Sequence, residues 1–310
     1  MAMTGGFRAG EETSLQEQKV ANFIQALIQG VAMGSLYGLI AIGYVLIYNA
    51  WGILNFAQGD MVMVGAFAVY VSHMRLGLPM WLAIPVALVM CMVIGFLIEI
   101  TAFRPLIDAI QQRRLIATIG IGIFLRNLVR VVFGADPYFF PPIFDNTPHK
   151  VGALTIVPQN IWNMVIGFLL IGALTLFLKR TTLGKSMRAT AQDREAARLM
   201  GINVKRSMSL TFIIASALGG LAGMLICPVF YVVPTLGSSM GNKGFSSALF
   251  GGISSDGGSM VGGIVLGLLE AIGATTISSA FQSSIAYAVL FLVLIFMPNG
   301  LFGKKESRKV

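Results

Sequence analysis

Residues 36–67 read "LYGLIAIGYVLIYNAWGILNFAQGDMVMVGAF", and this stretch indicates the class of fold. The part up to Trp51 carries no charged side chain, which is typical of a helix that crosses a membrane. Asn55, Gln58 and Asp60 then fall within six residues, beside a glycine, before the apolar run resumes. Because polar groups in hydrocarbon are costly, this cluster predicts a segment that faces protein or a water-filled path.

The composition of the whole chain agrees with a membrane protein. Its 310 residues are 56% hydrophobic and only 11% charged, and the mean hydropathy is +0.80, whereas a soluble domain carries about a quarter charged residues. The net charge of +9 comes mainly from short basic segments between apolar runs. This distribution follows the positive-inside rule, so we expect no binding of nucleic acid.

Eight stretches are long and apolar enough to be candidate membrane spans. We therefore expect an all-α polytopic membrane protein with about eight transmembrane helices. The expected organisation is a polar N-terminal segment (1–22), a single transmembrane domain (23–302) and a basic cytoplasmic tail (303–310). The candidate spans are 23–48, 53–74, 81–102, 115–133, 161–178, 207–230, 258–279 and 284–298.

The basic segments predict which loops face the cytoplasm. Segments 103–114 and 179–206 are basic, whereas loop 134–160 is rich in Pro and Asp and is expected outside. Counting back from 103–114 places the N-terminus outside. For the basic segments and the basic tail all to lie in the cytoplasm, the chain needs one more crossing. The Gly-rich stretch 241–258 must supply it, as a short broken element.

Two broken or re-entrant elements are thus expected, near 52–65 and near 241–258. Irregular backbone at membrane depth is tolerated where protein or a cavity satisfies it, and paired broken segments point to a transport path. The residues predicted to line the path are Asn55, Gln58, Gly59, Asp60, Gly251, Gly252 and Ser254.

Charged side chains inside the spans have structural as well as functional interpretations. Glu99 is expected to pair with Arg104, and Glu270 is expected to pair between helices. Arg126 and Arg130 share a helical face and are candidates to pair with Asp60 or Glu270, or to reach the outer membrane interface. For Asp60, two roles stay open, which are stabilising the positive end of the restarted helix and lining a pathway.

Catalytic signatures are missing from the sequence. The "GKS" at 184–186 resembles the end of a phosphate-binding loop, but Lys179 stands where that loop needs its first glycine. There is no G-x-S-x-G elbow and no H-E-x-x-H pattern. We therefore expect no enzyme, with no catalytic, cofactor-binding or metal-binding residues.

The basic segment 179–206 contains a predicted amphipathic helix, from about Met187 to Met200, with Gly201 as its C-terminal cap. Such a helix could lie on the membrane surface or dock into a soluble partner. Within it, the string Glu195-Ala196-Ala197-x-x-x-Gly201 resembles the EAA coupling loop by which permeases of bacterial ABC importers engage their ATPases.

The resemblance extends over nearly the whole chain. With 36–67, it is carried by "FRPL" (103–106) and by 183–225, 244–271 and "VLIFMPNGLFG" (293–303). In these stretches the chain resembles the permease subunits of high-affinity branched-chain amino acid ABC importers, of the Liv type and its H branch. The residues that the resemblance marks for ATPase coupling are Glu195, Ala196, Ala197, Leu199, Met200 and Gly201.

The resemblance implies a multi-pass subunit of the bacterial inner (plasma) membrane that forms half of a translocation path. Its partners would be a second homologous permease, two cytoplasmic ATPases that bind the ATP, a periplasmic substrate-binding protein and membrane lipid. The sequence departs from the family pattern at Gln58 and Asp60, where His and Glu are usual, and after Gly201, where I-x-L-P is absent. The alternative is an ion- or proton-coupled secondary transporter or channel, which would use membrane carboxylates as relays.

Overall fold

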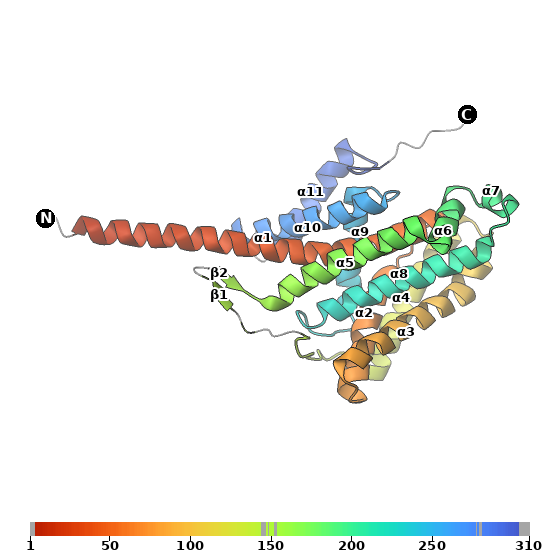
Figure 1. The fold of residues 1–310 in the computed structure, drawn as a ribbon, viewed down its shortest axis with the longest axis horizontal. Coiled ribbons are helices and arrows are strands. Elements are labelled where there is room, and N and C mark those ends of the chain that lie inside the picture. The colour runs from red at the N-terminus through yellow and green to blue at the C-terminus, as the bar shows by residue number, and fades with distance from the viewer. Residues whose placement is uncertain are drawn as a thin grey trace.

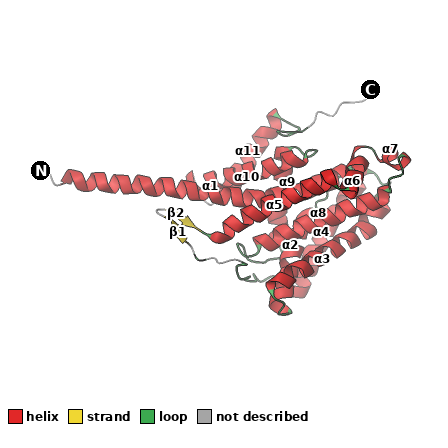
Figure 2. Ribbon diagram, viewed as in Figure 1, coloured by secondary structure: helices red, strands yellow, loops and turns green. Residues whose placement is uncertain are grey.

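The computed structural model describes residues 4–143, 147, 149–151, 154–276, 278 and 281–303. Helices make up nearly all of it (Figure 2). The helices are α1 (Thr4–Trp51), α2 (Gln58–Tyr70), η1 (Val71–Arg75), α3 (Met80–Ile98), η2 (Glu99–Phe103), η3 (Arg104–Leu106), α4 (Gln111–Phe133), α5 (Pro158–Arg180), α6 (Thr182–Gln192), α7 (Arg194–Leu199), α8 (Val204–Ile226), α9 (Leu236–Gly251), α10 (Asp256–Thr276) and α11 (Gln282–Phe296).

The all-α class is confirmed apart from one small hairpin. Strands β1 (His149–Val151) and β2 (Leu154–Ile156) pair antiparallel within the long loop between α4 and α5. Of the expected terminal segments, 304–310 lies outside the described residues, as do residues 1–3. The remainder of the expected N-terminal segment belongs to α1.

Six helices in the described part of the chain are long and apolar enough to cross a membrane, so the expected count of about eight is not confirmed. The expected spans 53–74 and 284–298 are helical but shorter, since α2 has 13 residues before it continues as the π-helical η1, and α11 has 15. The six are Val20–Trp51, Met80–Leu106, Gln111–Phe133, Pro158–Arg180, Val204–Ile226 and Asp256–Thr276.

Helix α1 is the central element of the bundle. Its apolar part is almost wholly buried and packs against α5, α8, α9 and α10. With 48 residues it is about 72 Å long, and its N-terminal part extends past the other helices on the side of β1 and β2 (Figure 1). Helices α3, α4 and α5 lie outside this core and expose apolar side chains, as expected for surfaces that face lipid.

Glycines bring the backbones of α1 and α10 into direct contact. A Cβ atom at Gly34 would lie 2.7 Å from Ile264 Cα, and one at Gly263 would lie 2.4 Å from Gly38 N. Small residues at such spacing allow close helix packing in a membrane, where the hydrophobic effect between helices is absent. The position of α10 against α1 therefore depends on these glycines.

The two expected breaks have different outcomes. The first is present, because α1 ends at Trp51 and α2 begins at Gln58. The second was placed too broadly, since residues 241–251 continue α9 and the interruption is limited to 252–255. Glycine lowers helix propensity, but α9 is packed against α1, α2 and α10, and tertiary packing outweighs propensity.

We predict that Gly263→Ala destabilises the folded permease, because its Cβ would meet the backbone of α1. Forced overpacking typically costs about 1–3 kcal/mol, so the thermal unfolding midpoint in detergent or nanodiscs should fall. The control is Gly120→Ala on α4, where a Cβ meets nothing within 4 Å. Equal unfolding midpoints for the two variants would contradict this account of the contact between α1 and α10.

Candidate functional site

A cavity of about 240 Å³ lies where α2 begins, between α1, α2, α4 and α9. Its wall combines one ion pair with aromatic side chains and with small residues. The lining residues are Tyr44, Phe56, Gly59, Asp60, Ile119, Gly122, Arg126, Gly237, Ser238, Gly241, Asn242 and Phe245.

The ion pair joins Asp60 of α2 to Arg126 of α4. Asp60 is only 3% exposed, and Arg126 Nε lies 3.2 Å from its Oδ1. Glycine makes room for this carboxylate, because a Cβ atom at Gly122 or Gly237 would meet an Asp60 oxygen at 2.4 or 2.9 Å. Of the alternatives left open for Arg126, pairing with Asp60 is the one that the structure shows.

The cavity lies near the middle of the bundle. Gly122 and Arg126 are close to the centre of the 23-residue helix α4. Near the start of that helix, Arg114 donates to the carbonyl of Trp51 at the end of α1. From there, residues 52–57 turn back into the bundle, and the backbone N–H of Phe56 donates to Thr118 Oγ1. This turn brings the start of α2 to mid-depth.

Four of the predicted path residues lie around the first break, and two of them line the cavity, Gly59 and Asp60. Asn55 instead accepts a hydrogen bond from Ala57 N, which holds the turn. Gln58 donates to Ala215 O on α8 and is buried between helices. Their role in transport stays a prediction.

The other three, Gly251, Gly252 and Ser254, lie at the opposite end of α9 from the cavity. The backbone N–H of Leu301 and Phe302 donates to the carbonyls of Phe250 and Gly251, so the chain after α11 covers this point. The structure does not bring these residues to Asp60, and their role also stays a prediction.

Sequence reasoning missed the part of α9 that faces the cavity. Gly237, Gly241 and Phe245 line it at intervals of four residues, which places them on one helical face. That spacing was visible in the sequence, but residues 241–258 were interpreted as a broken element and Gly237 was not considered.

A second cluster was also missed in part. The expected pairing of Glu270 between helices is confirmed, and its partner is Lys243 of α9, with Nζ 2.9 Å from Oε2. Tyr37 OH donates to the same oxygen. These three residues face a separate cavity of about 260 Å³. A lone Lys in a Gly-rich apolar stretch was the available signal.

The predicted single helix from Met187 to Met200 is wrong, because the chain forms two helices that meet at Asp193. Asp193 has an extended backbone, and its Oδ1 accepts hydrogen bonds from the N–H groups of Glu195 and Ala196 at 2.9 and 3.0 Å. An Asp in this position caps the N-terminus of the next helix. The cap gives α7 its own direction.

The predicted cap at Gly201 is confirmed. Gly201 has φ +79°, Ile202 N donates to Ala197 O, and Gly201 N donates to Arg198 O. This pair of hydrogen bonds is a Schellman motif, which favours glycine because the residue is left-handed. Helix α7 is therefore a single short unit that is capped at both ends.

Five of the six predicted coupling residues form an exposed tip. Ala197 is buried, whereas Glu195, Ala196 and Gly201 are exposed, and Leu199 and Met200 are 87% and 83% exposed. Figure 1 shows α7 at the end of the bundle opposite the N-terminus. The role of these residues in ATPase coupling stays a prediction.

Helix α7 is tied to the end of α1. Arg194 Nη2 donates to the carbonyl of Ala50 at 2.7 Å. Burial, together with the nearby charge of Arg114, lowers the pKa of Arg194 from its usual value. Because both arginines bind the last carbonyls of α1, cations stabilise the negative end of that helix.

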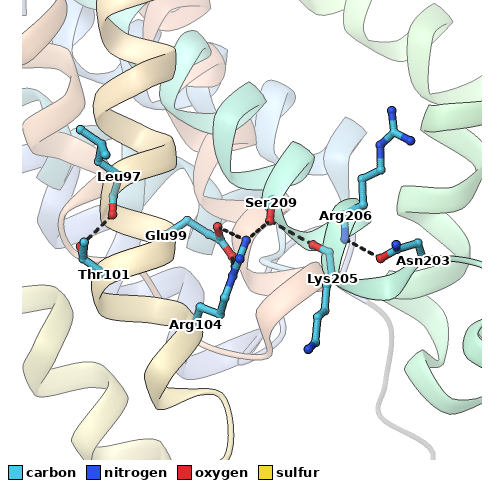
Figure 3. Close-up of polar contacts among 8 residues, drawn as sticks. All are labelled: Leu97, Glu99, Thr101, Arg104, Asn203, Lys205, Arg206 and Ser209. Atoms are coloured by element: carbon cyan, nitrogen blue, oxygen red, sulfur yellow. Dashed lines mark hydrogen bonds and ion pairs between the residues drawn. The ribbon is translucent and has the colours of Figure 1, made fainter.

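Close to α7, Arg104 of η3 links η2 to α8 (Figure 3). Its guanidinium forms a two-pronged contact with the buried carboxylate of Glu99, at 3.2 and 3.0 Å, and also donates to Ser209 Oγ at 3.0 Å. The expected Glu99–Arg104 pair is thus confirmed. Both residues line a cavity of about 580 Å³ that Arg194, Glu195 and Arg198 also face.

Comparison with known proteins identifies the family. The sequence pattern described as "Branched-chain amino acid transport system / permease component" matches residues 26–298. The chain belongs to this family. The permease is therefore a multi-pass protein of the inner membrane.

Among its relatives, LivH of Escherichia coli K12 is a high-affinity branched-chain amino acid transport system permease protein. It is 35% identical over 93% of this chain and 98% of its own. BraD of Pseudomonas aeruginosa, which carries the same description, is 34% identical over 94% and 99%. The ribose import permease protein RbsC of Haemophilus influenzae is 27% identical over 87% and 84%. These relatives are transport permeases and not enzymes.

We predict that Arg104→Met destabilises the permease by about 1–3 kcal/mol, because it leaves the buried Glu99 carboxylate without its donor. Thermal unfolding of the purified protein measures this loss. Arg113→Met is the control, because this substitution removes the same charge from an exposed position near the start of α4. A loss of stability in both variants alike would show that net charge, and not the pair, is responsible.

Proposed function

We propose that this chain is the membrane-spanning subunit of an ATP-driven importer of branched-chain amino acids or related small solutes, and that it forms half of the translocation path. The observation that carries the proposal is the match to permeases of branched-chain amino acid transport systems over nearly the whole chain. The exposed tip of α7, formed by Leu199 and Met200, supports it.

The energy for transport comes from partners. This chain has no phosphate-binding loop, so two cytoplasmic ATPases bind the ATP and the permease itself holds no cofactor. A second homologous permease completes the path, and a periplasmic binding protein delivers the solute to the side that carries β1 and β2.

The coupling step follows from the contacts of α7. Leu199 and Met200 dock on an ATPase, while Arg194 joins the same helix to the end of α1. A displacement of α7 therefore moves the end of α1, whose Tyr44 lines the mid-depth cavity. Nucleotide state shifts the permease between two conformations because the ATPase contacts α7 differently in each.

The membrane topology contains about eight crossings. Six are the long apolar helices, and the remaining two are α2 with its continuation η1 and the shorter α11. Helix α9 runs from the level of Asp60 to the end that carries α6, where Asp256 interacts with Arg188. Helix α9 is thus a further short segment in addition to these eight, and it supplies the extra crossing that the charge distribution requires.

The test is ATP-driven uptake by the reconstituted complex. Proteoliposomes that contain the permease, its ATPases and the binding protein should accumulate labelled leucine only when ATP is present. An ion- or proton-coupled carrier would instead accumulate leucine from an ion gradient without the ATPases. That second result would replace the proposal with the alternative.

We predict that the double variant Leu199→Asp and Met200→Asp loses its ATPases. Burial of one such side chain contributes about 1.5–3 kcal/mol, so association should weaken by about tenfold or more. Co-purification of the ATPases with the tagged permease measures the effect. Leu76→Asp, at the opposite end of the bundle and 64% exposed, should retain them. Full retention by the double variant would rule out the α7 tip as the docking site.

A further inference from the structure

The cavity beside Asp60 holds two opposite charges whose capacity for hydrogen bonds is not filled. Asp60 Oδ1 is buried and has no hydrogen-bond donor among the described residues, although Arg126 Nε lies at ion-pair distance. Arg126 Nε also donates to Gly122 O. Among the described residues, neither Nη1 nor Nη2 of Arg126 donates to a protein acceptor.

The remainder of the wall is mainly apolar or small, with uncharged polar groups at Tyr44, Ser238 and Asn242. Phe56, Ile119 and Phe245 form one aromatic and apolar portion, in which the Phe56 and Phe245 rings pack at a tilt with their centroids 5.6 Å apart. Gly59 and Gly241 leave space on the side of α2 and α9. A ligand that fits must therefore combine a compact charged end with an apolar side chain, inside about 240 Å³.

We propose that this cavity binds the zwitterionic end of an α-amino acid, in which Arg126 takes the carboxylate and Asp60 takes the ammonium group. The aromatic portion then contacts the aliphatic side chain. The assignment rests on the proposed function and adds the group by which the permease itself recognises its solute.

Charge balance favours a zwitterion over other small solutes. The pair is neutral as a whole, so a neutral ligand with two opposite ends adds contacts to both members and leaves no net charge buried. An ion of either sign would pair with one member and be repelled by the other. A neutral sugar would meet the pair with uncharged hydroxyl groups only, and such hydrogen bonds are weaker than those between two ionised groups.

The experiment measures binding by the permease–ATPase complex in lipid nanodiscs, without ATP and without the binding protein. Labelled leucine is displaced by leucine, by leucine amide, which lacks the carboxylate, and by 4-methylpentanoate, which lacks the ammonium group. Half-displacement of the label should require a concentration of each analogue about tenfold to hundredfold higher than that of leucine, because each analogue loses one hydrogen-bonded ion pair.

The variants assign each charge to its partner. Arg126→Gln should lower the affinity for leucine to that for leucine amide, and should leave the affinity for leucine amide unchanged. Asp60→Asn should lower the affinity for leucine to that for 4-methylpentanoate, and should leave the affinity for 4-methylpentanoate unchanged. Glu270→Gln, which breaks the buried pair of the other cavity, is the matched control and should preserve the order of the three ligands.

A variant that keeps the pair intact guards against loss of folding. Ser238→Phe fills the cavity from a partly exposed position and should prevent binding of all three ligands. Equal binding of leucine and both analogues, or equal weakening of all three by the charge variants, would overturn the assignment. Normal ATP-driven uptake without leucine binding to the permease would overturn it too, and would leave the proposed function standing. Absence of ATP-driven uptake by the wild-type complex would overturn the proposed function itself.

Discussion

Direct contact between helix backbones is the constraint on which this fold depends. In a bilayer the burial of apolar surface between helices contributes little free energy, because lipid is equally apolar. Van der Waals contact at glycine positions therefore stabilises the packing of the helices. Gly34 and Gly263 join α1 to α10, and Gly59 and Gly241 join α2 to α9 in the same way. The second contact lies beside Asp60, so the packing that holds the bundle together also shapes the cavity.

Sequence patterns predicted the features that depend on local chemistry. Long apolar runs identified most of the membrane helices, and the polar cluster after Trp51 marked the true break in the chain. Gly201 was recognised as a helix cap because only its position and residue type are needed. The Glu99–Arg104 pair is five residues apart, so proximity along the chain was enough.

What failed depends on contacts between distant segments. The glycines of 241–251 suggested a break, but burial among three other helices keeps α9 intact. Lys243 was overlooked because its partner, Glu270, lies on another helix. Asp193 was interpreted as one more polar residue of a single helix, whereas its extended backbone ends α6 and caps α7. The residues of the cavity come from four helices and from the turn before α2, and no single stretch of sequence contains them.

The length of α1 has a mechanical consequence. One uninterrupted helix extends from the arginines beside α7 to a point beyond the hairpin on the other side. It contains no proline that would let one half bend independently of the other. If a partner displaces the end beside α7, as proposed, this uninterrupted helix carries the displacement past its contact with α10 toward the opposite end. Events on the two faces of the bilayer are then mechanically linked without any relay of side chains.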